Sequence, residues 1–175
     1  IAEIADTQAG EIIRFAIKGS VGGKPAIEAS TGFLVRGTGS MRGAHSGHED
    51  GAGAEMLRAT FDTEDGQQLK YAEVSGDANF IHTSNFLAKL SGLPRTIMHG
   101  VCLLAMTGNC LSDEMLKGRR EPMKSISVRF ANPVIPGERV TVIVHKTKTK
   151  GRVAFTAVNA KGKEVMKNGV FEYAT

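Results

Sequence analysis

The sequence predicts an α+β fold in which one buried helix packs against a curled antiparallel sheet. The first observation is an apolar helical pattern over residues 101–117, which Gly118 follows as a C-terminal stop. The second is the long run after residue 124, where apolar and polar residues alternate in several segments. Helices followed by a run of strands are typical of the α+β class, and a helix apolar on several sides is expected to be wrapped by the sheet.

About the first forty residues also alternate in the manner of strands. Residues 11–18 and 24–36 predict two strands, separated by a turn at residues 21–23. From residue 37 to residue 53 the chain is rich in Gly, Ser and His, which is typical of a loop or linker. We therefore expect three parts: an N-terminal part over residues 1–43, a linker over 44–54 and a main domain over 55–175.

Two short helices are expected before the apolar helix. Thr63 is a candidate N-cap of a helix that runs to about Val74. A second helix is predicted over residues 84–90, with Thr83 or Ser84 as its N-cap and a Gly and a Pro after its end.

The main domain also contains the expected strands. Their positions follow from period-two alternation and from the turn residues between them. They cover approximately residues 56–61, 126–130, 140–145, 153–157 and 164–173, with a turn at 160–163 before the last strand.

Composition excludes several classes of protein. The net charge of +4 comes from scattered Lys and Arg, with 6% aromatics and no Trp, so no nucleic-acid surface is expected. A phosphorylated small molecule such as a coenzyme A ester suits this charge. No apolar run approaches the roughly 20 residues of a membrane helix, so no membrane partner is expected. No secretory signal is visible, and the lack of an initiator Met suggests that the chain starts upstream.

The two cysteines also bear on the compartment. Cys102 and Cys110 lie eight positions apart in the apolar helix, roughly 12 Å at the helical rise, which is beyond the reach of a disulfide. Without a disulfide framework, a reducing intracellular compartment is favoured.

The most informative segment contains a carboxylate, an amide and an imidazole within six residues. Asp77 follows Ser-Gly, which favours a turn, and Asn79 and His82 come shortly after it, so all three can reach one water molecule. Gly100 then opens the apolar helix, where its N–H lies at the positive end of the helix dipole and can stabilise an oxyanion. These groups suffice to add water to an α,β-unsaturated thioester, with no metal or redox cofactor.

Other interpretations of the same residues stay open. An Asp in a Ser-Gly-Asp turn is commonly an Asx-turn or cap residue, and a lone His is commonly structural. With His99 as a third ligand, Asp77 and His82 could form a metal site of two histidines and one carboxylate. The sequence lacks the short helical spacing of two histidines that such sites often show, so no metal is expected.

Three segments in order resemble the signature of the MaoC-like hydratases, the (R)-specific enoyl-CoA hydratases also called hydratase 2. They are Y-A-E-V-S-G-D-A-N-F-I-H at 71–82, A-x-L-S-G-L-P-x-x-I-M-H-G at 88–100 and V-R-F-A-N-P-V-I-P-G at 128–137. The resemblance implies one complete hot-dog domain over residues 55–175, a long helix wrapped by a curved antiparallel sheet.

The resemblance also implies roles for individual residues. Asp77 and His82 would be the catalytic pair that activates water, Asn79 would orient that water or the pair, and the Gly100 N–H would belong to the oxyanion hole. The segment also suggests His99 as a substrate-binding residue. One departure is Phe80, where the family usually has Pro, and this predicts altered loop packing or substrate fit.

Coenzyme A would enter as part of the substrate, and no cofactor is expected. Lys124 and Arg129, near the strand after the central helix, are candidates for contacting its phosphates, although each fits a solvated strand residue equally well.

The N-terminal part resembles the closing strands of the first hot dog in the two-hot-dog enzymes of this family. Since the rest of that first hot dog is not visible in residues 1–43, we expect association with a second copy, as a homodimer, or with the missing half. The expected function is reversible hydration of trans-2-enoyl-CoA to (3R)-3-hydroxyacyl-CoA. The alternatives are a 3-hydroxyacyl-ACP dehydratase of fatty-acid or polyketide synthesis and a non-catalytic acyl-CoA-binding subunit. The compartment is expected to be cytoplasmic or peroxisomal.

Overall fold

The computed structural model describes residues 1–7, 10–36 and 53–175. Most of the expected linker therefore lies outside the described residues. The chain divides into two compact units, Ile1–His48 and Glu49–Thr175, and each is described by itself.

The first unit is a three-stranded antiparallel sheet in the order β1-β2-β3. Its strands are β1 (Glu3–Thr7), β2 (Gly10–Val21) and β3 (Lys24–Arg36). Gly22 and Gly23 connect the last two strands with positive φ angles of 57° and 78°, the backbone that a tight two-residue hairpin requires. Both strands predicted from the alternation of the sequence are therefore present.

The second unit contains all the helices of the described residues and a five-stranded sheet. The helices are α1 (Gln67–Ser75), α2 (Phe80–Thr83), α3 (Asn85–Leu90) and α4 (Gly100–Leu116). The strands are β4 (Glu55–Asp62), β5 (Met123–Phe130), β6 (Arg139–Lys146), β7 (Arg152–Asn159) and β8 (Glu164–Tyr173). The strands are antiparallel in the order β4-β6-β7-β8-β5, so β4 and β5 form the two edges.

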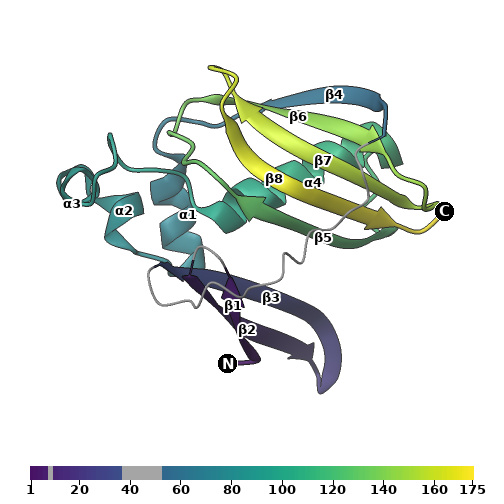
Figure 1. Cartoon of the computed structure of the whole chain (residues 1–175), viewed down its shortest axis with the longest axis horizontal. Helices are drawn as coiled ribbons and strands as arrows, with labels where there is room; N and C mark the ends of the chain where they lie inside the picture. The colour runs from purple at the N-terminus through teal and green to yellow at the C-terminus, as the bar shows by residue number, and fades with distance from the viewer. Residues whose placement is uncertain (8–9, 37–52) are drawn as a thin grey trace. The chain divides into compact units, whose positions relative to one another are not determined.

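One face of this sheet covers α4, and the core lies between them. The two strands β6 and β7 alternate: Val140, Val142 and Val144 of β6 are buried, while the residues between them are half-buried. They pack in one cluster with Phe155 and Phe171 from the sheet and with residues of α4. A sheet curved around one central helix is the hot-dog arrangement, and the predicted α+β class is confirmed (Figure 1).

The segment before α4 differs from the prediction in two places. Thr63 does not cap α1, because its hydroxyl donates to Glu138 O at 2.9 Å; Gly66, in a left-handed conformation, precedes the helix instead. The four-residue helix α2 was not predicted at all, since it is too short for a helical period to show. Ser84 does cap α3 as expected, with its Oγ 3.4 Å from Leu87 N.

These short helices position the functional segment. Figure 1 shows α1, α2 and α3 gathered at the end of the five-stranded sheet where α4 begins. Among residues 1–7, 10–36 and 53–175, no helix combines the length and apolar composition needed to cross a membrane.

Candidate active site

Asp77 lies in a turn that follows α1. Gly76 ends the helix with a positive φ of 74°, and its N–H donates to Ala72 O at 2.9 Å. The Asp77 N–H donates to Ser75 Oγ at 3.2 Å, and Asp77 Oδ1 accepts from Asn79 N at 3.2 Å. The carboxylate thus makes the Asx-turn contact that its sequence context allows, while its side chain remains 54% exposed.

Asn79 is the N-cap of α2, the helix that carries His82. Asn79 Oδ1 accepts from Ile81 N at 3.3 Å, which satisfies one of the free N–H groups of the first turn. The observed contacts of Asn79 are therefore structural, and its predicted role in orienting water remains a prediction.

His82 is fixed by a backbone carbonyl of the segment before α4. Its Nδ1 lies 2.8 Å from Ile97 O, and Ile97 N donates to Ile81 O at 3.1 Å. Because a carbonyl oxygen can only accept, Nδ1 must carry the proton of the neutral ring, and Nε2 keeps its lone pair. This tautomer makes Nε2 the atom of His82 that can take a proton.

His99 lies beside His82 at the N-terminus of α4. The two rings stack, with centroids 3.7 Å apart and an interplanar angle of 24°. His99 Nε2 lies 3.0 Å from Asp77 O and 4.0 Å from Asp77 Oδ2. The side chain is only 2% exposed, and Tyr71 packs on it at 4.8 Å between ring centroids. Its observed contacts are thus with the site residues, and its predicted contact with substrate remains a prediction.

The surroundings of His82 favour the neutral imidazole. Burial lowers the pKa of His82 most, and the neighbouring His99 lowers it further, against the opposing effects of the Ile97 carbonyl and Asp77. Burial likewise raises the pKa of the Tyr71 hydroxyl. A histidine with a lowered pKa stays neutral at pH values where an ordinary histidine becomes protonated, and it can therefore act as a base at neutral pH.

Gly100 is the first residue of α4. The first backbone hydrogen bond of this helix runs from Leu103 N to His99 O at 3.1 Å, so the N–H of Gly100 has no partner within the helix. A Cβ at this position would lie 2.9 Å from the ring of Phe130, so glycine lets β5 approach closely. An N–H at a helix start without a side chain is suited to a developing negative charge.

The structure brings the predicted catalytic residues together but leaves two other candidates apart. Possible ligand atoms of Asp77, His82 and His99 all lie within 4.8 Å of one another, and Gly100 directly follows His99. Lys124 and Arg129 are exposed on the edge strand β5. Since neighbouring residues of a strand point to opposite faces, Arg129 points away from the face that Phe130 presents to α4.

Two contributions were not expected from the sequence. The carbonyl of Ile97 fixes the tautomer of His82, and Tyr71 packs against His99. Both residues lie inside the motif segments, but a backbone carbonyl leaves no signal in a sequence, and the position of Tyr71 depends on how α1 packs.

The cluster of two histidines and one carboxylate also raises the possibility of a metal ion. His82 uses Nδ1 for Ile97 O, and His99 uses Nε2 for Asp77 O. The rings lie nearly parallel, so their in-plane lone pairs do not converge on a point about 2.0–2.1 Å from each nitrogen, as a bound zinc would require. The arrangement is better suited to proton transfer.

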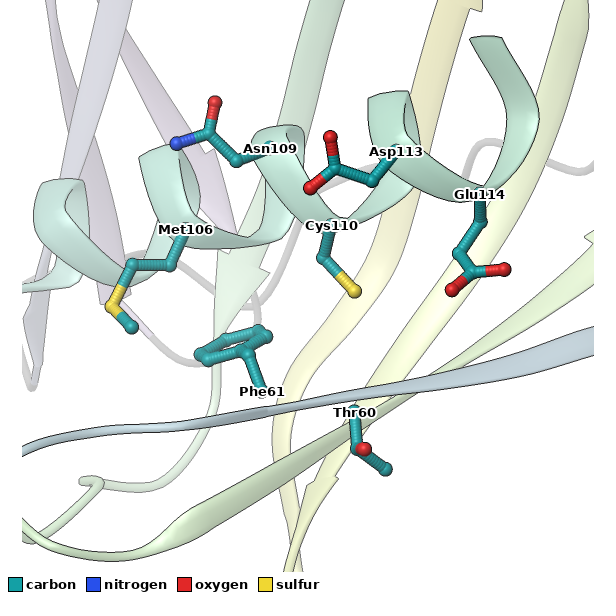
Figure 2. A pocket seen from close by; sticks show the side chains of 7 residues that line it. All are labelled: Thr60, Phe61, Met106, Asn109, Cys110, Asp113 and Glu114. Carbon is teal, nitrogen blue, oxygen red and sulfur yellow. The ribbon is translucent and has the colours of Figure 1, made fainter. Parts of the chain in front are cut away.

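A groove of about 280 Å³ lies elsewhere, between α4 and the edge strand β4 (Figure 2). Its lining combines apolar and acidic side chains: Thr60, Phe61, Met106, Asn109, Cys110, Asp113 and Glu114. None of the candidate catalytic residues lines it. Cys110 and the buried Cys102 are both free thiols, and burial raises the pKa of each.

Fold and site together define a class: a hot-dog domain with a carboxylate and an imidazole beside the N-terminus of its central helix. Residues 52–168 match the family described as "MaoC like domain". The chain belongs to this family.

Relatives of known name support the same assignment. The 3-hydroxyacyl-thioester dehydratase Y of Mycobacterium tuberculosis is 30% identical over 188 residues, covering 99% of this chain and 64% of that protein. The peroxisomal enoyl-CoA hydratase 2 of Arabidopsis thaliana is 36% identical over 98 residues, covering 51% of this chain and 31% of that protein.

Solved structures agree. The MaoC-like dehydratase of Phytophthora capsici superposes with a TM-score of 0.84 at 26% identity, covering 98% of this chain and 59% of that one. This chain thus spans about three fifths of the length of relatives that it matches from end to end.

Proposed function

We propose that this domain reversibly adds water to a trans-2-enoyl thioester. The observation that carries the proposal is the His82 tautomer: Nδ1 donates to Ile97 O, which leaves Nε2 as a proton acceptor in a cluster with Asp77. The names of the relatives, a 3-hydroxyacyl-thioester dehydratase and an enoyl-CoA hydratase, support the same chemistry.

In the hydration direction, a water molecule binds between the Asp77 carboxylate and His82 Nε2. The site takes one proton from this water while its oxygen forms a bond to C3, and the C2–C3 double bond opens toward the thioester. One proton then goes to C2, so the elements of water are added with no net oxidation or reduction. General acid–base catalysis of this kind is worth roughly 10²–10⁴-fold in rate.

Negative charge accumulates on the thioester oxygen as C3 is attacked. In the proposed binding mode this oxygen accepts from the Gly100 N–H at the start of α4, where the helix dipole adds to the stabilisation. The reaction requires no cofactor, and coenzyme A or another thiol carrier enters with the substrate. We propose the (3R) product because the motifs are those of the R-specific hydratases.

Hydration of crotonyl-CoA and of a longer enoyl-CoA, followed by the loss of ultraviolet absorbance, tests the proposal. Asp77→Ala and His82→Ala should each lower kcat/KM about a hundredfold or more. Glu73→Gln is the matched control, because this exposed carboxylate lies on α1 one turn before Asp77 and should leave the rate unchanged. Full activity in both alanine variants would contradict the assigned roles.

The same assay separates the remaining functions. Turnover of carrier-protein thioesters but not of CoA esters would assign the domain as a 3-hydroxyacyl-ACP dehydratase. Binding of acyl-CoA without turnover of either substrate would assign it as a binding subunit. Chiral analysis of the 3-hydroxyacyl product tests the R assignment independently.

We further propose that the first unit packs against a partner, either a second copy or a preceding hot-dog half. One face of its sheet is apolar, since Ile4 pairs with Ile13 and Ile13 with Phe33 in register. Phe15 packs edge-on to Phe33, with the ring centroids 5.9 Å apart. Phe33 nevertheless remains 59% exposed, and Ile17 remains 52% exposed. A contiguous apolar face of this kind is typical of a protein–protein contact.

Light scattering coupled to size exclusion tests this association. The wild-type chain should elute above its monomer mass, and Phe33→Asp should shift it toward the monomer. Ser30→Asp, on the opposite face of the same strand, is the control. A wild-type chain that is monomeric at all concentrations favours the preceding half as the partner, and adding that half should then restore a complex. Failure of both would reject the association.

A reducing intracellular compartment is proposed as well, because both cysteines are free thiols in α4. The choice between cytoplasm and peroxisome is part of the same proposal, and a peroxisomal location is recorded in the name of one relative.

A further inference from the structure

We propose that His99 is a positioning residue, which holds the Asp77 turn and the His82 ring in place without itself contacting the substrate. The expected effect of His99 on the rate rests on the proposed function. The positioning itself is argued from the contacts that His99 makes in the structure.

The first contact is a hydrogen bond to the backbone of Asp77. His99 Nε2 lies 3.0 Å from Asp77 O, and a carbonyl oxygen only accepts, so Nε2–H is the donor. Asp77 otherwise lies in an exposed turn that is held by contacts with Ser75 and Asn79, residues no more than two positions away. The bond from His99 is the long-range contact that ties this turn to the start of α4.

The second contact is the stack on His82. The ring centroids lie 3.7 Å apart at 24°, and the hydrogen bond to Ile97 O fixes one edge of the His82 ring. Together, the stack and the hydrogen bond define both the plane and the rotation of the imidazole. His99 thus contacts each member of the proposed catalytic pair through a different part of one side chain.

A third observation argues that an imidazole is needed at this position. With Nε2 protonated, Nδ1 of His99 is an acceptor, and it is buried with no hydrogen-bond partner among the described residues. Buried polar atoms are nearly always paired, and an unpaired one is unfavourable. A phenylalanine could stack on His82 without this penalty, but it could not donate to Asp77 O.

Burial excludes the simplest alternative role. At 2% exposure, behind His82 and against Tyr71, His99 has almost no surface with which to contact a substrate. An effect of His99 on catalysis is therefore expected through the groups that it contacts, Asp77 and His82, and through Gly100, which directly follows it at the start of α4.

Two substitutions separate the two contacts. His99→Gln can place an amide N–H where Nε2 lies but loses the stacked ring, whereas His99→Phe keeps a ring but loses the donor. If the donor positions Asp77, His99→Phe should lower kcat by about tenfold or more with little change in KM, because small misplacements of catalytic groups are costly. His99→Gln should recover most of this loss. A phenylalanine variant with wild-type kcat would overturn the role of the hydrogen bond to Asp77 O, and wild-type kcat in both variants would overturn the proposal.

Amide hydrogen exchange provides a measurement that does not depend on turnover. In His99→Phe the segment Asp77–His82 should exchange faster than in the wild type, while β6 and β7 retain their protection. In His99→Gln the segment should stay protected. Unchanged exchange in the phenylalanine variant, or loss of protection across the sheet in both variants, would refute a positioning role.

The two measurements also distinguish a failure of this inference from a failure of the proposed function. If the wild-type chain hydrates neither CoA nor carrier thioesters, the proposed function fails, and the exchange experiment alone decides the role of His99. If the wild type is active and the two variants match it in both measurements, only the inference about His99 fails.

Discussion

Both units are built from antiparallel strands, yet their apolar side chains end in opposite environments. In the second unit Phe171 of β8 is fully buried between the sheet and α4. In the first unit Phe33 of β3 lies on an apolar face but is 59% exposed. Alternation decides which face of a strand is apolar, but burial requires an opposing layer. Only the second unit contains that layer within the described residues.

The largest expected effect is the difference between two phenylalanine deletions. Phe171→Ala should lower the free energy of unfolding by about 3–5 kcal/mol, because it leaves a cavity in the core. Phe33→Ala should cost less than about 1 kcal/mol in the isolated chain, since little of its surface leaves water. Urea denaturation followed by circular dichroism measures both. Equal costs would mean that a partner already covers the first unit under the conditions used.

A smaller effect is expected at the start of α2. Asn79→Ala removes the N-cap contact to Ile81 N and should destabilise the second unit by roughly 1 kcal/mol. Asn79→Ser keeps a cap and should recover most of this stability. If the hydratase rate also recovers in the serine variant, the amide acts through the cap; a rate that stays low would support its predicted role in orienting water.

Phe80→Pro is expected to stabilise the second unit slightly. Phe80 is the first residue of α2, and Asn79 before it has φ −51° and ψ 131°, which is compatible with a following proline. Proline fixes the φ angle of residue 80, which restricts the unfolded chain and should add about 0.4–1 kcal/mol to the free energy of unfolding. Phe80→Ala removes the same ring without fixing φ and is the control. A lower thermal midpoint for Phe80→Pro than for Phe80→Ala would show that the backbone at position 80 does not accommodate proline and would contradict this prediction.

The smallest expected effect is a difference between the two units in how their stability changes at acid pH. The pKa of His82 lies below its ordinary value of 6.5 in the folded state, so the unfolded chain takes up a proton first as the pH falls. The stability of the second unit should therefore decrease as the pH falls through about 6.5 toward the lower folded-state pKa of His82, whereas β1–β3 contain no histidine in their described residues. Amide exchange, corrected for its intrinsic pH dependence, measures both units in one sample. Equal changes in the two sheets would contradict this assignment.

The sequence predicted the elements that depend on periodicity. The last strand, residues 164–173, and the strand at residues 24–36 agree with the structure residue for residue, and the apolar helix agrees within one residue at each end. The start of α1 was wrong because Thr63 bonds to Glu138, which is far away in the chain, instead of to the helix that follows it. Local capping rules cannot anticipate a competing partner of that kind.

In the candidate site, too, local sequence patterns predicted one part, and the other part depends on long-range packing. The clustering of Asp77, His82 and Gly100 near one another follows from motif spacing and is present in the structure. The stack of His99 on His82 could not be predicted, because it depends on how the segment before α4 lies against α2. The types of residue in a motif predict the chemistry of the site, whereas the mutual orientation of their side chains depends on tertiary packing.

The role of Ile97 has a consequence for how such sites vary. Its N–H and C=O both bind the segment that carries His82, while its side chain takes no part in either bond. Another apolar side chain at position 97 could therefore leave both backbone hydrogen bonds in place. A search that scores side-chain identity would pass over it. Replacing the following peptide bond by an ester would weaken this carbonyl as an acceptor without altering a side chain, and it would also remove the Met98 N–H that donates to Val134 O at 2.8 Å.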